Sequence, residues 1–476
     1  MMVVESALLV IPAVISLCYG EFLKDGVYFI IVAAATCLVF LPLAFLTKQP
    51  AKILYAREAF SLVALCWVLW SLIGALPFLL SGTLTNYIDC IFEATSGFTT
   101  TGATVFEDVE CLPHGILLWR SLMHWVGGMG VLVLALAVLP MTGGGNYMNL
   151  FRAEMTGSEV GKLVPKAKKT AFILYAIYTA MTVALTVLLI LGGMPVFDSI
   201  NHAMSTAGTG GMSVKNASIG AYDSTYIDIV VTVFMFMMGV NFTLYFMLLK
   251  GKVKDFFKSA ELRFYAIEFV IVSLLIALVL RFKGGEDFFH ALRLSTFQAA
   301  SLMSSTGYAT TDTNVWVPIA KVILIICMLI GACAGSTGGG IKVSRIQIAG
   351  KTIARDVKRQ INPRYVCAVR SEGKPVDNPT INAVMTFIAS YFAILFASVA
   401  ILAATGINFE TGFTSVVSGL SNMGPFFSEG AATTSNYMFM PYIAKIVLSA
   451  DMLLGRLEIF PFLILFSRST INRKLF

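Results

Sequence analysis

Charged residues are scarce in this sequence. Asp, Glu, Lys and Arg make up 13% of the 476 residues, whereas soluble domains average about 25%. Hydrophobic residues reach 57%, and the mean hydropathy is +0.81. Apolar stretches such as residues 60–80 have the ~20 residues that a helix needs to cross a ~30 Å hydrocarbon layer. The composition therefore excludes a string of soluble domains and predicts an all-α protein that crosses a membrane several times.

Residue patterns for metal binding and catalysis are also lacking. The eight cysteines contain no CxxC pair and the four histidines stand alone, so neither a zinc site nor a disulfide framework is indicated. No Ser/His/Asp, HExxH or paired-carboxylate arrangement occurs. We therefore expect a protein that is not an enzyme and that holds no covalently bound cofactor.

The distribution of basic residues indicates the orientation of the chain. Ten apolar windows place both termini on one side of the membrane; they lie at residues 4–22, 27–47, 60–82, 116–140, 170–194, 225–249, 262–282, 316–349, 380–405 and 438–467. On that side, 25 of the 34 Lys and Arg residues lie in five segments, residues 48–57, 152–169, 250–263, 342–374 and 468–474. Because cytoplasmic loops carry such an excess, we expect cytoplasmic termini. The net charge of +7 then reflects topology and does not indicate nucleic-acid binding.

Four polar runs that contain glycine interrupt the apolar sequence. They read ATSGFTTTGAT (94–104), AMSTAGTGGMS (203–213), AASLMSSTGYA (299–309) and VVSGLSNMGPF (416–426). One glycine position recurs in all of them: Gly102, Gly211, Gly307 and Gly424. A serine stands six residues before each glycine: Ser96, Ser205, Ser301 and Ser418. The glycines are 109, 96 and 117 residues apart, which indicates an internal repeat of span, re-entrant segment and span.

Such a repeat predicts a narrow path for cations. Non-helical backbone at membrane depth survives only where protein buries it or water bathes it. Glycine permits backbone angles closed to other residues, so carbonyl oxygens can point inward and replace a cation's hydration shell. We expect four pseudo-symmetric membrane-pore-membrane repeats around one pore, as in potassium channels, with one cation site. The predicted filter residues, which would bind the cation, are Thr100, Thr101, Gly102, Thr209, Gly210, Gly211, Thr306, Gly307, Asn422, Met423 and Gly424. The alternative, a small-xxx-small helix packing motif, does not explain the fourfold recurrence.

A second glycine-rich segment, GACAGSTGGGIKVSR at residues 331–345, interrupts the eighth apolar window. A break of this kind in a spanning helix marks a hinge or a cavity-lining loop. The phosphate-loop pattern GxxxxGK[ST] is not met, because Ile341 separates the last glycine from Lys342. We expect a gate below the filter rather than a passive kink. The predicted gate residues are Gly335, Ser336, Thr337, Gly338, Gly339 and Gly340.

The last span contains charged residues, among them Lys445 and Arg456. Charges inside spans are costly and normally face a bundle interior or an aqueous path. We expect Arg456 to face the permeation route as part of the gate; the alternative is a structural ion pair with Asp451 or Glu458. The roles of Lys445 and Lys321 stay open between the pathway and structure.

The motifs in combination resemble a known family. FEATSGFTTTGATV, STAGTGGMS, SSTGYATTD, NMGP, GSTGGGIKVSR and MLLGRLEIF are similar to motifs of the Trk/Ktr/HKT superfamily of potassium transporters, especially the bacterial TrkH type. The resemblance covers essentially the whole chain. It implies potassium uptake across the bacterial inner membrane through a gated, cation-selective pore. It also implies filter glycines at the four positions above, a gating loop at residues 335–340 and a pore constriction at Arg456.

The resemblance also implies the domain organisation and the partners. We expect an extra two-helix domain followed by four repeats, at residues 1–50, 51–150, 151–255, 256–360 and 361–476. The implied assembly is a homodimer in the lipid bilayer on a TrkA-type cytoplasmic subunit that binds nucleotides. The substrate is potassium, and the preference over sodium and any symport with protons or sodium stay open. The competing hypothesis is an ion-coupled secondary transporter of a small solute, a class that usually shows two inverted halves rather than four units of equal polarity.

Overall fold

The computed structural model describes residues 1–46, 56–130, 167–364, 367–428 and 436–465. This part of the chain is helical, with one short hairpin of strands β1 (Arg370–Ser371) and β2 (Lys374–Pro375). Five of the described helices are long and apolar enough to cross a membrane, or six if a bent pair counts as one span. The predicted all-α, multi-pass membrane protein is therefore confirmed.

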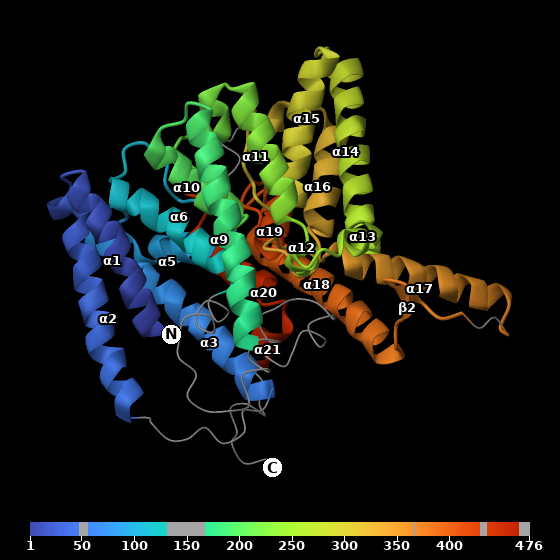
Figure 1. Cartoon of the computed structure of the whole chain (residues 1–476), viewed down its shortest axis with the longest axis horizontal. Helices are drawn as coiled ribbons and strands as arrows, with labels where there is room; N and C mark the ends of the chain where they lie inside the picture. The colour runs from blue at the N-terminus through green and yellow to red at the C-terminus, as the bar shows by residue number, and fades with distance from the viewer. Residues whose placement is uncertain (47–55, 131–166, 365–366, 429–435, 466–476) are drawn as a thin grey trace.

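Two antiparallel helices form the N-terminal part of the molecule. Helix α1 (Met2–Cys18) and helix α2 (Val27–Leu46) are joined by a single π-helical turn, η1 (Phe22–Gly26). They pack together at one edge of the molecule (Figure 1). At the turn, Glu21 accepts hydrogen bonds from the backbone and ring of His114, which begins helix α6 of the main body. The pKa of Glu21 is lowered, because these bonds outweigh the effect of its partial burial.

The rest of the described chain consists of four units, each with a first helix, a short pore helix and a second helix. Unit one has α3 (Ala56–Gly74) with α4 (Leu76–Leu80), then α5 (Tyr87–Phe98) and α6 (His114–Gly128). Unit two has α9 (Ala167–Leu191), α10 (Val196–Ala207), and α11 (Thr225–Met238) with α12 (Phe242–Leu249). The short helix α13 (Val253–Lys258) leads to unit three, which has α14 (Ala260–Gly284), α15 (Phe288–Met303), α16 (Pro318–Ile330) and α17 (Val343–Ile361). Unit four has α18 (Asn378–Ala404), α19 (Phe409–Ser421), α20 (Tyr442–Arg456) and α21 (Phe460–Leu465).

The second helices are interrupted, which the apolar windows at 225–249 and 438–467 did not predict. Helices α11 and α12 meet at 93°. At the break, a Cβ on Gly239 would overlap the Tyr265 hydroxyl, and Asn241 caps the new helix at the Thr243 amide. Between α20 and α21, Glu458 and Ile459 have φ of 56° and 66°, values that end an α-helix. The window 316–349 breaks between Ile330 and Val343, as its glycines predicted. The second part of the window 116–140 lies outside the described residues.

Two of the four predicted repeat boundaries fall within the described residues. Those at 50/51 and 150/151 lie outside the described residues, as do most of the basic segments 48–57 and 152–169 and the tail 468–474. The boundary at 255/256 falls within α13, and the one at 360/361 falls at the end of α17.

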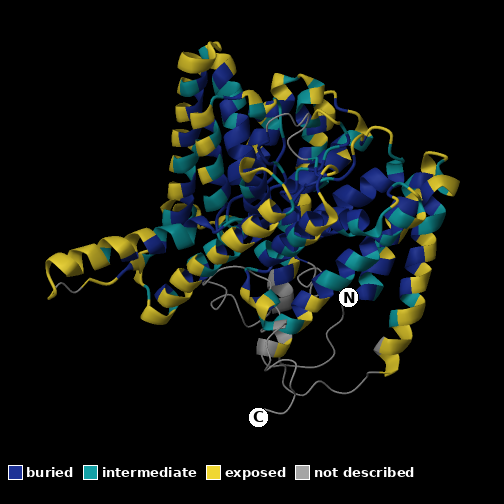
Figure 2. Ribbon diagram, turned by 180° about the vertical axis from the view of Figure 1, so that it is seen from behind, coloured by how far each residue is buried: buried dark blue, intermediate teal, exposed yellow. Residues whose placement is uncertain are grey.

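Apolar side chains cover the outside of the molecule as well as its core. Helices α2, α9 and α14 expose large aliphatic and aromatic residues along their outer faces. Figure 2 shows exposed residues along α2 and α14 at the two sides of the molecule. In a soluble protein such a surface would aggregate, whereas in a bilayer it faces lipid. Inside, aromatic rings connect the N-terminal helices to unit one, since Phe29 lies edge-to-face on Trp119 and Trp119 on Phe98.

We predict that Phe29→Ala destabilises the protein, because Phe29 is fully buried where α2 meets α6. Replacement of a buried Phe by Ala typically costs about 3–5 kcal/mol. The thermal midpoint of the purified protein in detergent should fall clearly. Ile31→Ala, which removes a side chain that is 50% exposed on the same helix, should change the midpoint little. Equal midpoints for the two variants would contradict the packing described.

Candidate functional site

Each pore helix ends in the same backbone turn. The amide just before the recurrent glycine donates to the carbonyl of the recurrent serine five residues earlier: Thr101 to Ser96 (2.9 Å), Gly210 to Ser205 (2.9 Å), Thr306 to Ser301 (2.8 Å) and Met423 to Ser418 (3.0 Å). This bond is the outer bond of a Schellman motif, the common C-terminal cap of helices. All four serines have no exposed surface, so the turn accepts only a small side chain. The fourfold serine register is thus a structural feature of the helix ends.

The residue inside each turn adopts a left-handed conformation without being glycine. These residues are Thr100, Thr209, Ser305 and Asn422, with φ of 57°, 55°, 61° and 53°. A non-glycine residue there costs roughly 1–2 kcal/mol. Two positions later stand the recurrent glycines, with φ of 81°, 75°, 83° and 87°. Ser305 was not among the residues predicted from the sequence, although its position two residues before Gly307 matches that of Thr100 before Gly102.

The four glycine segments close into a ring. A Cβ on any of the four glycines would lie less than 3.0 Å from a backbone carbonyl oxygen of the next unit: Gly102 against Gly210, Gly211 against Thr306, Gly307 against Met423, and Gly424 against Thr101. The order runs from unit one through unit four and returns to unit one. Eight of the eleven predicted filter residues take part in these contacts, and the other three, Thr100, Thr209 and Asn422, precede them in the same segments. We call this closed circle of backbones the glycine ring, after Gly102, Gly211, Gly307 and Gly424.

A cavity lies on each side of the glycine ring. The outer cavity, of about 310 Å³, is lined by Gly102, Gly211 and Gly307 together with loop residues such as Asp312. The inner cavity, of about 410 Å³, is lined by Asn422 and by residues of the glycine-rich loop at 331–342 and the end of α20. The ring thus separates two solvent-sized spaces within the helical body. Above it, Asp108 accepts hydrogen bonds from the Cys111 thiol and the Asn216 amide, which lower the pKa of its carboxyl group.

The glycine-rich loop (residues 331–342) lies directly beneath the ring. The Gly339 amide donates to the Ser305 hydroxyl at 2.6 Å, and a Cβ on Gly339 would overlap the Ser421 carbonyl. The loop is also bonded to the break in unit two, since the Cys333 amide donates to the Gly239 carbonyl at 3.0 Å. Of the predicted gate residues, Gly338 and Gly339 therefore lie against the ends of pore helices α15 and α19, whereas Gly335 lies against Asn241 at the start of α12.

Arg456 connects this loop to unit one. Its guanidinium donates to the Thr337 carbonyl at 2.8 Å and to the carbonyls of Gly127 and Gly128, the latter at 2.7 Å. It also lines the inner cavity. The carboxylates considered as alternative partners contact other groups, because Glu458 forms an ion pair with Arg345 and Asp451 accepts from Ser398. Arg456 thus lies beside the glycine-rich loop, at the wall of the inner cavity.

Ion pairs join neighbouring units, and they explain the two lysines whose roles were open. Lys445 of α20 contacts Asp89 of pore helix α5 at 2.7 Å, and Lys321 of α16 lies 3.8 Å from Glu410 of pore helix α19. Lys445 and Lys321 are each the fourth residue of their helices. The fourth residue of α11, Asp228, contacts Arg293 of pore helix α15 at 2.8 Å. The boundary between units two and three therefore has an equivalent ion pair with the charges exchanged: the acid is on the second helix and the base is on the pore helix.

A ring of four backbone segments from one chain, between two cavities and within a bundle of membrane helices, defines a pore-type membrane transport protein. Comparison with known families agrees with this class. Residues 22–474 match the family model TrkH, described as cation transport protein, and the chain belongs to this family.

Individual relatives match over nearly the whole chain. The chain is 35% identical to the Trk system potassium uptake protein TrkH of Salmonella typhimurium, covering 98% of this chain and 96% of that protein. It is also 35% identical to the Trk system potassium uptake protein TrkG of Escherichia coli, covering 88% and 87%. The crystal structure of the potassium transporter TrkH from Vibrio parahaemolyticus superposes with a TM-score of 0.88 at 33% identity, covering 98% of this chain and 97% of that one.

We predict that Asp228→Asn lowers the stability of the protein and that reversal of the pair restores it. Asp228 is nearly buried but Arg293 is partly exposed, so we expect a loss of roughly 1–3 kcal/mol, below the ~3–5 of a fully buried pair. The double variant Asp228→Arg, Arg293→Asp should regain most of the thermal midpoint, because the neighbouring boundary already has that polarity. Glu286→Gln, in an exposed pair with His290, serves as the control. A double variant less stable than Asp228→Asn would argue against a pairwise contact.

Proposed function

We propose that this protein takes up potassium across the bacterial inner membrane through a gated, cation-selective pore. The observation that carries the proposal is the closed glycine ring, in which each glycine abuts a carbonyl of the next unit. Relatives named potassium uptake proteins match 98% of the chain. A passage lined by backbone oxygens suits a bare monovalent cation. The cavity on each side of the ring supports access of the cation from both faces of the membrane.

The proposed filter consists of the eleven residues predicted from the sequence, with Ser305 added. In each unit, the residue with a positive φ two positions before the glycine would orient the carbonyls that follow it. Because the four segments differ in sequence, the coordination around the cation should be less regular than in a filter of four identical chains. One principal site at the level of the glycines follows from this irregularity.

The proposed gate is the glycine-rich loop together with Arg456. Gly335 and Gly340 have φ of 71° and 82°, so the loop uses conformations that other residues resist. Arg456 bonds the loop to unit one across the inner cavity. A positive charge at this depth opposes cations and keeps the loop under the ring. Opening would require the loop to exchange these hydrogen bonds for water.

The proposed assembly is a homodimer whose cytoplasmic face docks a TrkA-type subunit that binds nucleotides. Helix α17 projects from the body of the molecule (Figure 1) and carries Lys351, Arg355, Lys358 and Arg359. Cytoplasmic excess of such residues supports termini on the same side. Four units of equal polarity around one ring give no support to the secondary transporter of an organic solute.

We predict that Gly307→Ser weakens selectivity for potassium over sodium. A Cβ at Gly307 would overlap the Met423 carbonyl, and its φ is 83°, so the ring must distort. If this distortion costs the bound potassium ~1–3 kcal/mol more than sodium, the flux ratio should fall by roughly 5- to 150-fold. Uptake of radioactive rubidium and sodium into proteoliposomes measures that ratio without any organic solute.

Gly285→Ser is the matched control for this variant. Gly285 has a φ of 75° but nothing within 4 Å of a Cβ, so it shares the backbone strain without touching the ring. Its flux ratio should equal that of the unaltered protein. An unchanged ratio in Gly307→Ser would refute the filter assignment, and absence of rubidium flux in the unaltered protein would refute the function.

We predict that Arg456→Ala raises rubidium flux several-fold, because it removes both the positive charge and the hydrogen bonds to the loop. Arg281→Ala, at an exposed arginine in the last turn of α14, should leave flux unchanged. A fall in flux with an unaltered thermal midpoint would show that Arg456 supports the conducting state instead.

A further inference from the structure

A buried ion pair lies behind the glycine ring in unit one. Glu93 of α5 and Arg120 of α6 meet at 2.7 Å, with side chains 0% and 3% exposed. The position nine residues before the recurrent glycine is polar in every unit, and its occupants are Glu93, His202, Gln298 and Ser415. Unit one alone has an acid at this position of the sequence.

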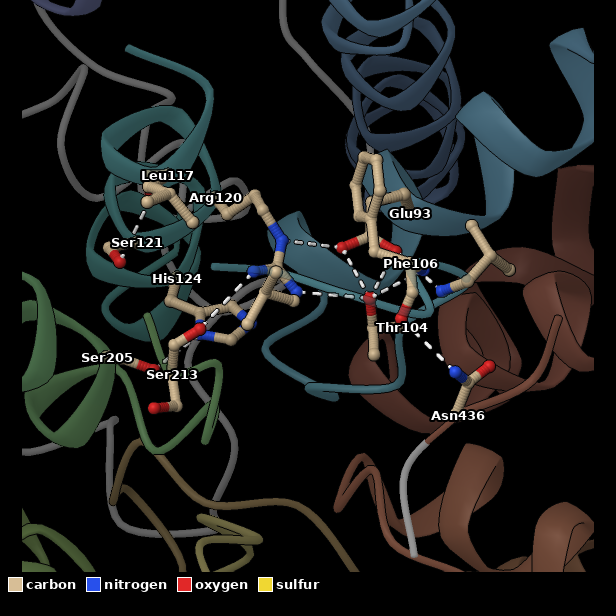
Figure 3. A network of polar contacts seen from close by, with 12 residues as sticks. Glu93, Thr104, Phe106, Leu117, Arg120, Ser121, His124, Ser205, Ser213 and Asn436 are labelled. Atoms are coloured by element: carbon tan, nitrogen blue, oxygen red, sulfur yellow. Dashed lines mark hydrogen bonds and ion pairs between the residues drawn. The ribbon is translucent and has the colours of Figure 1, made fainter. Parts of the chain in front are cut away.

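The Glu93 carboxylate holds the chain just outside Gly102. It accepts from the Val105 amide at 2.9 Å and from the Thr104 hydroxyl at 3.1 Å, besides Arg120. Figure 3 shows Arg120 and Glu93 converging on Thr104. Hydrogen bonds to a charged group are stronger than neutral ones, so the outer rim of unit one is fixed more firmly than a neutral residue at position 93 would allow.

Arg120 extends this network to unit two. Its guanidinium donates to the Thr104 hydroxyl at 3.1 Å and to the Ser213 carbonyl at 3.4 Å. Thr104 and Ser213 each stand two residues after their ring glycine, so Arg120 bridges equivalent points of neighbouring units. On the other side, Tyr437 of unit four donates its amide to the Thr104 carbonyl at 2.7 Å and its hydroxyl to the Gly424 carbonyl at 2.8 Å. Thr104 thus lies in a network that joins units one, two and four.

The pair also sets the charge at the wall of the outer cavity, because Arg120 is one of its lining residues. An unbalanced guanidinium there would repel cations before they reach the ring, and a cleft with low-dielectric walls focuses such a field. Glu93, in direct contact with Arg120, balances that charge. The arginine can then serve as a bridge between units without closing the path to cations.

We propose that the Glu93–Arg120 pair positions the outer rim of the glycine ring and keeps the outer cavity permissive to cations. Two separable effects follow: hydrogen bonds of the pair set selectivity, and its charge balance sets the rate. Neither residue contacts the transported ion through its side chain in this scheme. The proposal rests on the proposed function, since it assumes that cations cross the ring.

The test compares Glu93→Gln, Arg120→Gln and the double variant, reconstituted as full chains in proteoliposomes, by rubidium and sodium uptake. Glu93→Gln should lower the rubidium rate by about tenfold, in the range of electrostatic effects on association, and reduce the rubidium-to-sodium ratio. The rate defect should shrink at high ionic strength, because salt screens the uncompensated charge. The double variant should recover most of the rate but keep the reduced ratio.

A merely structural role would give a different pattern. It would lower the thermal midpoint and scale rubidium and sodium uptake down together in all three variants, without salt dependence, and that outcome would overturn the proposal. Asp228→Asn is the matched control, because it breaks an ion pair between units two and three away from the ring and should leave the ratio unchanged.

A shorter carboxylate provides a second route if Glu93→Gln does not fold. Glu93→Asp keeps the charge but withdraws the oxygens from Val105, so the rate should persist while the ratio falls. An unaltered ratio in Glu93→Asp and Arg120→Gln would overturn the proposal. Failure of the unaltered protein to take up rubidium would instead refute the proposed function, which keeps the two failures distinct.

Discussion

Each ring glycine lies close to a carbonyl of the next unit, and this close approach limits what the surrounding chain can do. A side chain at any of the four positions would overlap backbone, and backbone cannot move aside as a side chain can. The chain must therefore have glycine at that level in every unit, and all four glycines have a positive φ. That requirement sets where each pore helix ends, and it places the capping turn and the buried serine before the glycine.

A ring formed by four separate segments needs contacts that keep the units together. Three boundaries have an ion pair between the fourth residue of a second helix and the following pore helix, with either polarity. At the boundary from unit one to unit two the fourth residue is Leu117, which cannot form such a pair. There Arg120, one turn later on α6, reaches the Ser213 carbonyl instead. A charged side chain therefore joins each pair of neighbouring units around the ring.

The repeat, the ring glycines and the loop beneath them could be predicted from the sequence, because glycine that recurs at one register in apolar surroundings indicates a constraint on the backbone. We could not predict that Lys445 pairs with Asp89, which is 356 residues away. The position of a charged residue in the sequence does not show which distant residue it contacts. Ser305 was missed because serine, unlike glycine, does not by itself indicate a left-handed conformation. Its alignment with Thr100, two residues before the ring glycine, would have indicated its position in the filter segment. The bends at Gly239 and Glu458 were missed because the hydropathy of α12 and α21 continues that of the preceding helices. The residues that contact these bends, Tyr265 and Arg345, are distant in the sequence.

Placing four units in one chain allows each to differ where identical subunits could not. The buried pair of Glu93 and Arg120 belongs to unit one, the glycine-rich loop to unit three, and Arg456 to unit four. A loop as long as residues 331–342, repeated four times, would collide with itself beneath one ring, and four arginines at the level of Arg456 would repel one another in a cavity of about 410 Å³. A single copy of each avoids both costs. Fourfold symmetry is therefore retained at the backbone of the ring, where the geometry requires it, and is lost in the side chains above and below, where one copy suffices.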